Sequence, residues 1–516
     1  MARENPEKCL ARASKAQTEM DANRGLFEDA YEYLMPFRNT YSPKTGTHNK
    51  NTKQYDSTGM IAANNFVNTM QANFTPVFQK WAELVSGPSV PEDLKEEENK
   101  ALQKISDKIH SFRNASNFYT ATAEMYFDLG IGTGVLFVLK GDAVKPFNYV
   151  AAPLSQVALE DGKNGEVSGL YRTHKVKARA IKASWPKAKI SKHLADTIRD
   201  KPDDSLEFIE AFYYDYDEFK WYQDVIWTGE KDVRVYEDDF SEAPFVAPRW
   251  MKIPGFATGV GPFLMAMADY KTLNKMKELT LMLAALNVFG VYTVASNGTF
   301  NASTAQIKPA AFIPVERNGT QNPSIAPLPR AGDFQIQEYM LQDLKDQIKQ
   351  TMLDNRLPSE QDPVRTAFEI AERIKKMQTN IGAAFGRLFY EFVIPLHRRE
   401  IAILQELNLI DVPAGFQVDN FLTEIKVVSP IAQTQAAEDI QKFTQAFQLT
   451  AGISPEIAML TFDVENAGTW ISETIGVDAN LIRSKDSKAA ITKAVEKIIA
   501  QQQMAAQQAQ QPAAGA

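Results

Sequence analysis

The sequence predicts an α+β protein that is mainly α. Three observations carry this prediction: helical patterns fill the first 130 residues, aromatic and β-branched runs with turn signals fill residues 130–250, and long helices with one apolar stripe follow Pro262. The chain has 516 residues, 44% of them hydrophobic and 23% charged, as in ordinary globular proteins. Length alone indicates roughly three domains of about 150 residues each.

The N-terminal quarter is predicted to be helical. One charged helix covers residues 11–34, and a polar loop follows it over 39–54. The run Tyr55-Asp56-Ser57-Thr58 supplies side chains that cap helix starts, so a helix is expected from there towards Pro76. A second charged helix is expected over residues 91–118, and the first 130 residues therefore contribute several separate helices.

Residues 130–250 are predicted to form antiparallel β-structure. Gly130, Gly132 and Gly134 resemble part of a dinucleotide-binding fingerprint, but that motif needs a strand before it and a helix after it. Here a helical pattern precedes and a strand-like run at 135–140 follows, so we favour a glycine turn that enters a strand. Farther along, the runs at 206–214 and 220–227 flank an acidic turn and predict a hairpin.

Long helices dominate the rest of the chain. The first begins at Pro262 and a second covers residues 334–353, with a proline-rich, irregular or β-like segment between them. A third runs from 364 to about 409, where Pro395 should kink it because proline removes one helical hydrogen bond. The apolar stripes of such long helices need a partner, and further copies of the same chain would provide it.

The C-terminal part is predicted to hold shorter helices, at residues 436–449, 455–459 and 485–500. The last residues, 501–516, are rich in Gln and Ala. Composition leaves open whether this tail extends the last helix or frays.

Charge and cysteine content bound the class of protein. Lys and Arg total 56 against 64 Asp and Glu, a net charge of −8, so we expect no tight grip on nucleic acid over the whole surface, while looser contact stays open. Cys9 is the single cysteine, which excludes an internal disulfide and indicates a reducing compartment. No apolar run reaches the roughly 18–20 residues that span a bilayer, and the charged start lacks a signal-peptide core, so no membrane partner is expected.

No motif predicts catalysis. The sequence has no phosphate-binding loop of the form G-x-x-x-x-G-K-[ST], which argues against an NTP-driven motor. Its five histidines have no zinc-binding spacing, and the acidic turns at 215–218 and 237–239 are interpreted as solvated loops. We therefore expect no enzyme activity, no catalytic residues, no cofactor and no metal site.

Several short motifs follow one another in a particular order between about residues 25 and 450. In chain order they are Tyr33-Leu-Met-Pro36-Phe-Arg38, Tyr55-Asp-Ser-Thr58, Phe74-Thr-Pro76 before Trp81, Gly132-Thr-Gly134, Pro248-Arg249-Trp250, Gly259-Val-Gly261-Pro262 with Leu273-Asn274 beyond it, Arg365-Thr-Ala-Phe-Glu369, Pro395 with Arg398-Arg399, and Ser429-Pro430-Ile-Ala432 with Gln435. Taken together, their order and spacing resemble the head-to-tail connector, or portal, proteins of short-tailed double-stranded DNA phages (podovirus type). Val260 departs from the family, which often has an arginine there, so no role for an arginine is inferred.

The resemblance implies the phage portal fold. Residues 1–260 would form the wing, with a helical N-terminal part and a β-rich part at 130–250. The stem helices would be 261–287 and 333–353, with the clip at 288–332 between them. A tunnel loop at 354–364, a long kinked wing helix and connector at 365–430, an α-helical crown at 431–500 and the Gln/Ala-rich tail at 501–516 would complete the chain.

The resemblance also implies a function and its partners. A viral portal protein forms a homododecameric ring around a double-stranded DNA channel at one capsid vertex, and serves genome packaging, head-to-tail joining and DNA ejection. The implied partners are further copies of the chain, the DNA, the terminase large subunit, a tail adaptor, the major capsid protein, and scaffolding and internal core proteins. The implied location is the virion, after assembly in the host cytoplasm.

Two groups of residues are predicted to make these contacts. The residues expected to face DNA, in the tunnel loop and stem, are Asn355, Arg356, Ser359, Glu360, Gln361, Lys345 and Lys349. Those expected to dock partners at the clip are Asn297, Asn301, Lys308, Glu316 and Arg317. The lysines have a plainer interpretation as a solvated helix face.

Two other functions stay open at this stage. One is a nucleic-acid-processing enzyme with a divergent site. The other is an internal scaffold or core protein, which should be far more helical and lack the β-rich block.

Overall fold

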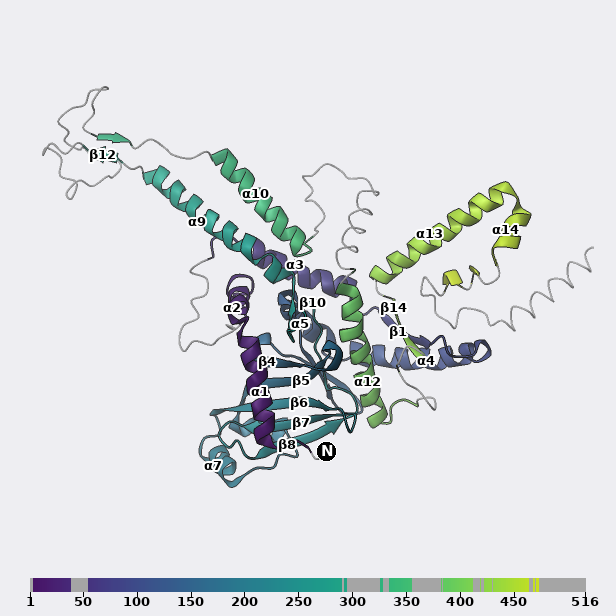
Figure 1. Ribbon diagram of the computed structural model, residues 1–516, viewed down its shortest axis with the longest axis horizontal. Helices are drawn as coiled ribbons and strands as arrows, with labels where there is room; N and C mark the ends of the chain where they lie inside the picture. Colours follow the sequence, from purple (N-terminus) through teal and green to yellow (C-terminus); the bar gives the residue numbers. More distant parts are fainter. Residues whose placement is uncertain are drawn as a thin grey trace, which may run out of the picture.

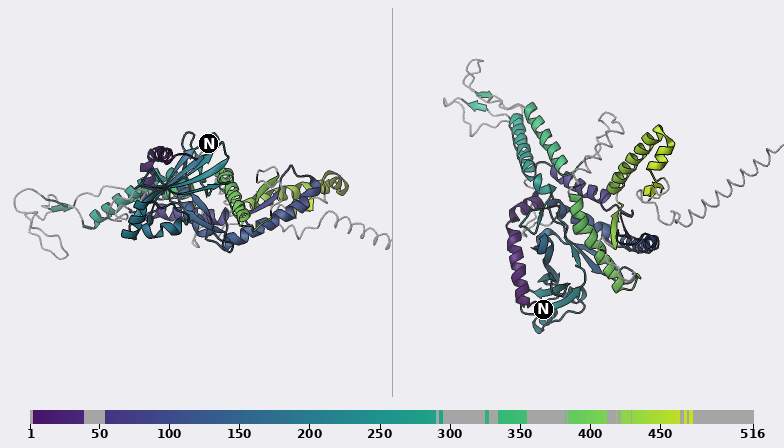
Figure 2. Two further views of the ribbon diagram at one scale, coloured as in Figure 1. Left: turned by 90° about the horizontal axis from the view of Figure 1, so that it is seen from below. Right: turned by 45° about the vertical axis from the view of Figure 1, so that its right-hand side comes forward.

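The computed structural model describes residues 3–38, 54–289, 292–294, 325–327, 334–354, 382, 384–411, 418, 422–428, 430–463, 467–468 and 470–472. These residues form a mixed helical and β body from which two helical projections extend (Figures 1 and 2). One projection is α9 (Met267–Phe289) with α10 (Phe334–Thr351), and the other is α13 (Pro430–Ile453) with α14 (Pro455–Thr461). The predicted α+β class is confirmed.

Two antiparallel sheets form the centre of the body. The larger has the order β4 (Val157–Asp161), β5 (Val167–Lys177), β6 (Ser205–Asp215), β7 (Lys220–Trp227) and β8 (Arg234–Phe240). The smaller has the order β3 (Phe147–Ala151), β2 (Leu136–Lys140) and β9 (Phe245–Val246). The predicted hairpin is confirmed as β6 and β7, and the Asp215 carboxylate closes its acidic turn by accepting bonds from the backbone nitrogens of Asp217 and Glu218.

The first helix differs from its prediction. The expected single helix over 11–34 is wrong: α1 (Pro6–Asp21) ends and α2 (Arg24–Tyr33) begins after a break at Ala22 and Asn23. The break lets α1 lie along the large sheet, where burial raises the pKa of the Cys9 thiol to about 12 and keeps it unreactive at neutral pH.

The other N-terminal helices follow the predicted pattern. The helix expected after Tyr55 is α3 (Thr58–Asn73), and the second charged helix is α4 (Glu92–Asn114), followed by α5 (Phe118–Ile131). The sequence did not reveal β1 (Ala82–Ser86), which pairs antiparallel with β14 (Thr423–Val427). This pair joins parts of the chain that are remote in sequence.

Glycines allow two backbone segments to cross in direct contact. A Cβ atom on Gly132 would lie 2.1 Å from the carbonyl oxygen of Gly259, and one on Gly261 would lie 2.2 Å from the carbonyl oxygen of Gly130. The Gly261 nitrogen donates to the Ile131 carbonyl at 2.6 Å. The crossing joins the end of α5 to the strands β10 (Met251–Lys252) and β11 (Gly259–Val260). The predicted glycine turn before a strand is confirmed for Gly132 and Gly134, which lie between α5 and β2, whereas Gly130 belongs to α5.

The third long helix is described from residue 384 onward, and its predicted start at 364 lies outside the described residues. A π-helical turn, Phe389–Val393, precedes α12 (Ile394–Glu406), in which Pro395 stands in the first turn. A π-turn next to a proline fits the predicted irregularity, because proline cannot donate its hydrogen bond.

Two buried arginines hold this helix to the body. Arg249 binds Glu391 of the π-turn in a two-pronged pair, with its Nε and Nη2 atoms 3.0 and 2.8 Å from the two carboxylate oxygens. Arg113 of α4 binds Glu400 of α12, at 3.1 Å from Nε to Oε1. Each pair satisfies a charge that would be costly to bury alone.

The predicted helices near the C-terminus are confirmed in part. Those expected over 436–449 and 455–459 are α13 and α14. The helix expected over 485–500 and the tail lie outside the described residues. Among the described residues, none of the helices is long and apolar enough to cross a membrane.

We expect Gly132→Ala to destabilise the fold by about 1–3 kcal/mol, because the new methyl group would meet a backbone carbonyl that cannot rotate away. Chemical denaturation measures the loss. Gly25→Ala is the matched control, since a Cβ atom there meets nothing within 4 Å. Equal stability of the two variants would contradict the crossing.

We expect the stability of the fold to depend on pH through the buried side chain of His397. Burial, reinforced by Arg113, lowers the pKa of His397 to about 4, whereas an unfolded chain has a histidine pKa near 6.5. The unfolded state therefore binds the extra proton between about pH 6.5 and 4, so this stabilisation is complete above that window and is lost as the pH falls through it. His397→Gln should make the fall in unfolding free energy shallower, by at most about 1.4 kcal/mol per pH unit, and a slope unchanged from wild type would exclude this role.

Candidate functional site on the helical arm

The pair α9 and α10, which we call the helical arm, is the most prominent projection. The chain leaves the body through α8 (Pro262–Met265) and α9 and returns through α10, and the two arm helices lie side by side (Figure 1). Their predicted positions are confirmed, with one interruption at Ala266. Between them, β12 (Tyr292–Val294) pairs with β13 (Ile325–Pro327), which agrees with the β-like character expected there.

The apolar side chains of the arm are buried at its base and exposed farther out. Those of α9 lie all round the helix, so the single apolar stripe predicted for it is wrong. Tyr270, Leu273, Ile348 and Met352 have no exposed surface. The outer apolar side chains are exposed by fractions from 49% to 75%; they are Leu279, Leu281, Met282, Tyr339 and Met340. The body therefore covers only the inner apolar side chains of the arm.

A polar junction fixes the base of α9. The Asn274 side-chain oxygen accepts hydrogen bonds from the backbone nitrogens of Tyr55 and Asp56, at 2.8 and 3.3 Å. The Tyr270 hydroxyl donates to the Asp56 carbonyl at 2.6 Å, and the Asp56 carboxylate caps α3 by accepting from the Thr58 nitrogen at 2.7 Å. The capping run and the Leu273-Asn274 motif are thus two halves of one contact.

The base of α10 is held to the same region. Asn65 of α3 donates to the Asp354 carboxylate at 2.8 Å, just beyond the end of α10. Lys345 lies half-buried with its Nζ atom 3.8 Å from the Asp56 carboxylate. Both arm helices therefore converge on α3, and Asp56 contacts each of them.

Only two of the predicted DNA-facing residues lie in the described chain. Lys345 is engaged with Asp56, whereas Lys349 is more exposed and lies 3.8 Å from Asp346 of its own helix. The others lie outside the described residues: Asn355, Arg356, Ser359, Glu360, Gln361, and the clip residues Asn297, Asn301, Lys308, Glu316 and Arg317. Contact with DNA or partners stays a prediction for all of them.

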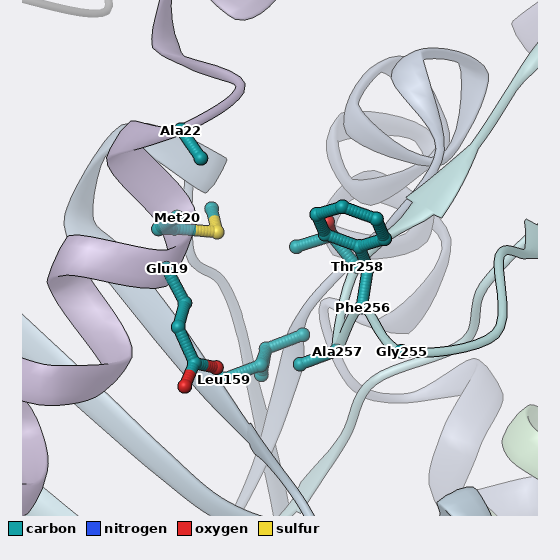
Figure 3. Close-up of a pocket in the computed structure, with 8 residues that line it drawn as sticks. All are labelled: Glu19, Met20, Ala22, Leu159, Gly255, Phe256, Ala257 and Thr258. Carbon is teal, nitrogen blue, oxygen red and sulfur yellow. The ribbon is translucent and has the colours of Figure 1, made fainter.

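A pocket of about 150 Å³ lies elsewhere, between the end of α1, β4 and the turn 255–258 (Figure 3). Met20 and Phe256 stand on opposite walls, and Glu19 is the one ionisable residue among those that line it. A single carboxylate supplies neither an acid–base pair nor a metal-binding set. The described residues also contain no group of three His, Cys, Asp or Glu side chains that could hold a metal ion.

Comparison with known proteins assigns the chain to a family. A family model described as bacteriophage head to tail connecting protein matches residues 6–482. The chain belongs to this family. The resemblance inferred from the sequence motifs is thereby confirmed, and with it the expectation of a phage head-to-tail connector.

Two curated relatives of this connector span nearly its whole length. A "Probable portal protein" of Bordetella phage BPP-1 is 24% identical, over 97% of this chain and 92% of the relative. A "Portal protein" of Salmonella phage epsilon15 is 21% identical, over 93% of this chain and 89% of the relative. A solved chain from a "Virion of native gene transfer agent (GTA) particle" aligns with a TM-score of 0.35 and 11% identity, covering 79% of this connector and 91% of that chain, and adds nothing to the assignment.

The structure explains why several connector motifs occur together. Gly132-Thr-Gly134 and Gly259-Val-Gly261-Pro262 meet at the backbone crossing, and Arg249 pairs with Glu391. Sequence reasoning found the motifs but missed these partners, together with the Asp56–Asn274 junction. No local signal could have paired them, because each partner is remote in the chain.

We expect Asn274→Ala to weaken the junction by about 1–3 kcal/mol, since two backbone N–H groups would lose their acceptor. Hydrogen exchange at residues 54–60, followed by mass spectrometry, measures the effect directly. Asn64→Ala is the matched control, because Asn64 is exposed and bonds only within its own helix. Protection of residues 54–60 that is unchanged in Asn274→Ala would contradict the junction.

Proposed function

We propose that the chain is the subunit of a phage portal. About twelve copies would close into a ring by repeating one head-to-tail contact, around a channel for double-stranded DNA at one capsid vertex. The ring would act in genome packaging, in head-to-tail joining and in DNA ejection. The observation that carries this proposal is the family match over residues 6–482, supported by two relatives named as portal proteins.

The exposed outer half of the helical arm supports a ring. Its apolar side chains lie on an elongated pair of helices that the body does not cover. Neighbouring arms packed side by side would bury them, at a gain of about 25 cal/mol per Å² of apolar surface. In this arrangement α8, α9 and α10 form the stem and residues 288–332 the clip.

The remaining parts take the roles that the portal proposal gives them. Residues 1–260 would form the wing, 354–364 the tunnel loop, 365–430 the kinked helix and connector, and 431–500 the crown. The clip would dock the terminase large subunit and later the tail adaptor, and the wing and crown would contact the major capsid protein and the scaffolding and core proteins. The chain would act in the virion as a structural protein, after assembly in the host cytoplasm.

The charge of the arm suits a conduit. Within the described part of α9, Lys271, Lys275 and Lys277 stand against Asp269 and Glu278, so the helix is nearly neutral. A wall of low net charge releases few counterions from DNA and therefore holds it weakly. DNA could then slide past the stem, which a strongly basic lining would oppose.

Electron microscopy of the purified chain tests the proposal. Rings with a central hole, with their symmetry counted, are the expected result. Monomers that cleave nucleic acid or hydrolyse ATP would instead support an enzyme and overturn the portal proposal.

We expect deletion of residues 355–362 to leave rings intact but to impair DNA packaging or retention, because the proposed tunnel loop would be lost. Packaging measured as nuclease-protected genome per particle checks this. A deletion of equal length in the tail, residues 507–514, serves as the control. Full-length packaging by the 355–362 deletion would refute the tunnel assignment while leaving the ring in place.

A further inference from the structure

One segment of this acidic chain is strongly basic. Between residues 172 and 201 the sequence has ten Lys or Arg residues and two Asp residues, a local charge of +8 within a chain whose net charge is −8. We call these residues the basic lobe. Such a segregation of charge needs an explanation, because lysines that only aid solubility are usually mixed with carboxylates.

The basic lobe is a folded addition to the large sheet. It includes the end of β5 and the connection from β5 to β6. These strands are antiparallel neighbours in the sheet, so a hairpin turn of two residues could join them. Instead, the connection forms α6 (Ile181–Ser184) and α7 (Lys192–Asp200). Trp185 and Leu194 bury themselves with Phe208 of β6 in a small apolar cluster separate from the main core, so the lobe is held in a fixed shape.

The lobe lies away from the helical arm. Figure 1 shows α7 at the end of the body opposite to the side from which α9 and α10 project, and the second view in Figure 2 agrees. A ligand of this lobe would therefore be distinct from DNA inside the proposed channel.

All three arginines of the lobe already have carboxylate partners. Arg172 pairs with Glu210, Arg179 with Asp203, and Arg199 with both Asp196 and Asp200. Two lysines are paired as well, Lys189 with Glu237 and Lys201 with Asp204. A further carboxylate, that of Glu230, lies against the lobe and accepts a hydrogen bond from the Ser191 hydroxyl.

Five exposed lysines remain, and none has a carboxylate within 4.0 Å among the residues that the structure describes. They are Lys175, Lys177, Lys182, Lys187 and Lys192. Lys175 lies directly across the strand pair from Glu207, which offsets part of its charge. Lys182, Lys187 and Lys192 lie outside the strands, on α6, on the connection and at the start of α7. Glu230 approaches the last of them through its hydrogen bond with Ser191, but it forms no ion pair with Lys192.

The chemistry of this surface fits phosphate. Lysine is a compact point charge that binds phosphate oxygens without reading bases. A protein partner would instead be expected to find apolar or aromatic anchors, yet none of the exposed large hydrophobic residues in the described chain falls between 172 and 201. Protein–DNA interfaces are polar and basic, as this lobe is.

We propose that the basic lobe binds the phosphate backbone of double-stranded DNA, without sequence preference, at a site outside the channel. Lys182, Lys187 and Lys192 are its principal contacts. The site goes beyond the proposed portal function, because it assigns DNA binding to a surface of the body remote from the arm.

The test compares two triple variants of the full-length chain. Lys182→Glu, Lys187→Glu and Lys192→Glu remove the site, whereas Lys8→Glu, Lys15→Glu and Lys104→Glu change the net charge equally at exposed lysines on α1 and α4. Fluorescence anisotropy with a labelled 30-base-pair duplex, over a series of salt concentrations, measures binding. A Lys→Gln version of the first triple replaces it if the Glu version does not fold.

The lobe variant should bind at least about tenfold more weakly than wild type at low salt, and its slope of log K against log salt should be smaller by about 3, one for each lost phosphate contact. The control variant should stay within about threefold of wild type. Wild-type affinity in the lobe variant, or equal losses in both variants, would overturn the proposal. DNA binding that persists while binding of polyglutamate is lost would show a site for acidic proteins and would equally overturn it.

Electron microscopy of the same samples keeps this result apart from the portal proposal. Both triple variants should form the same particles as wild type, because the lobe is remote from the arm. Failure of the wild type to form rings would count against the portal alone, and the duplex measurements would still decide the lobe.

Discussion

The backbone crossing of residues 130–132 with residues 259–261 is the constraint on which the rest of the structure depends. A side chain at Gly132, Gly259 or Gly261 would force the two segments apart, because its Cβ atom would meet a backbone carbonyl of the other segment. The crossing fixes where α5 ends and where α8 begins, and so it fixes the point from which the helical arm leaves the body. Everything beyond, including the junction at Asp56, needs that starting point.

Buried ion pairs fix the position of the long helix on the body, as the crossing fixes the start of the arm. Arg249 also donates to the carbonyl oxygens of Gly165 and Ala257, and Tyr149 donates to Glu400 beside Arg113. Pairs of this kind contribute little net stability, because both charges lose their hydration. They specify one register, since any slip of α12 along the body would leave charges buried without partners.

Local features of the fold could be predicted from the sequence. The β6–β7 hairpin, the capped start of α3 and the two arm helices each depend on residues close together in the chain, where periodicity and turn chemistry decide. The break between α1 and α2 was missed because residues 11–34 carry a helical pattern on both sides of it, and the packing of α1 against the sheet is a tertiary contact. The pairing of β1 with β14 and of Asn274 with Asp56 depends on tertiary contact, which no pattern within one segment encodes.

For the candidate site, the family and the positions of the arm helices were predictable from the sequence, but its contacts were not. The order of the motifs led to the connector family, and the positions of the arm helices followed from their apolar periodicity. The engagement of Lys345 by Asp56 did not follow, because a lysine on a helix face looks the same in sequence whether it faces solvent or a neighbouring carboxylate. The uneven exposure of the arm's apolar side chains was equally hidden, since only the packing of the body shows how far along the arm it reaches.

The antiparallel pairing of β1 with β14 has a consequence for the integrity of the chain. Residues 82–86 pair with residues 423–427 at five positions of an antiparallel ladder. The polypeptide between the two strands is therefore closed at both ends by this pairing. If the backbone is cut once between these strands, the two fragments stay associated through the β1–β14 pairing and through the buried core. The protein can thus be nicked there without falling into two halves.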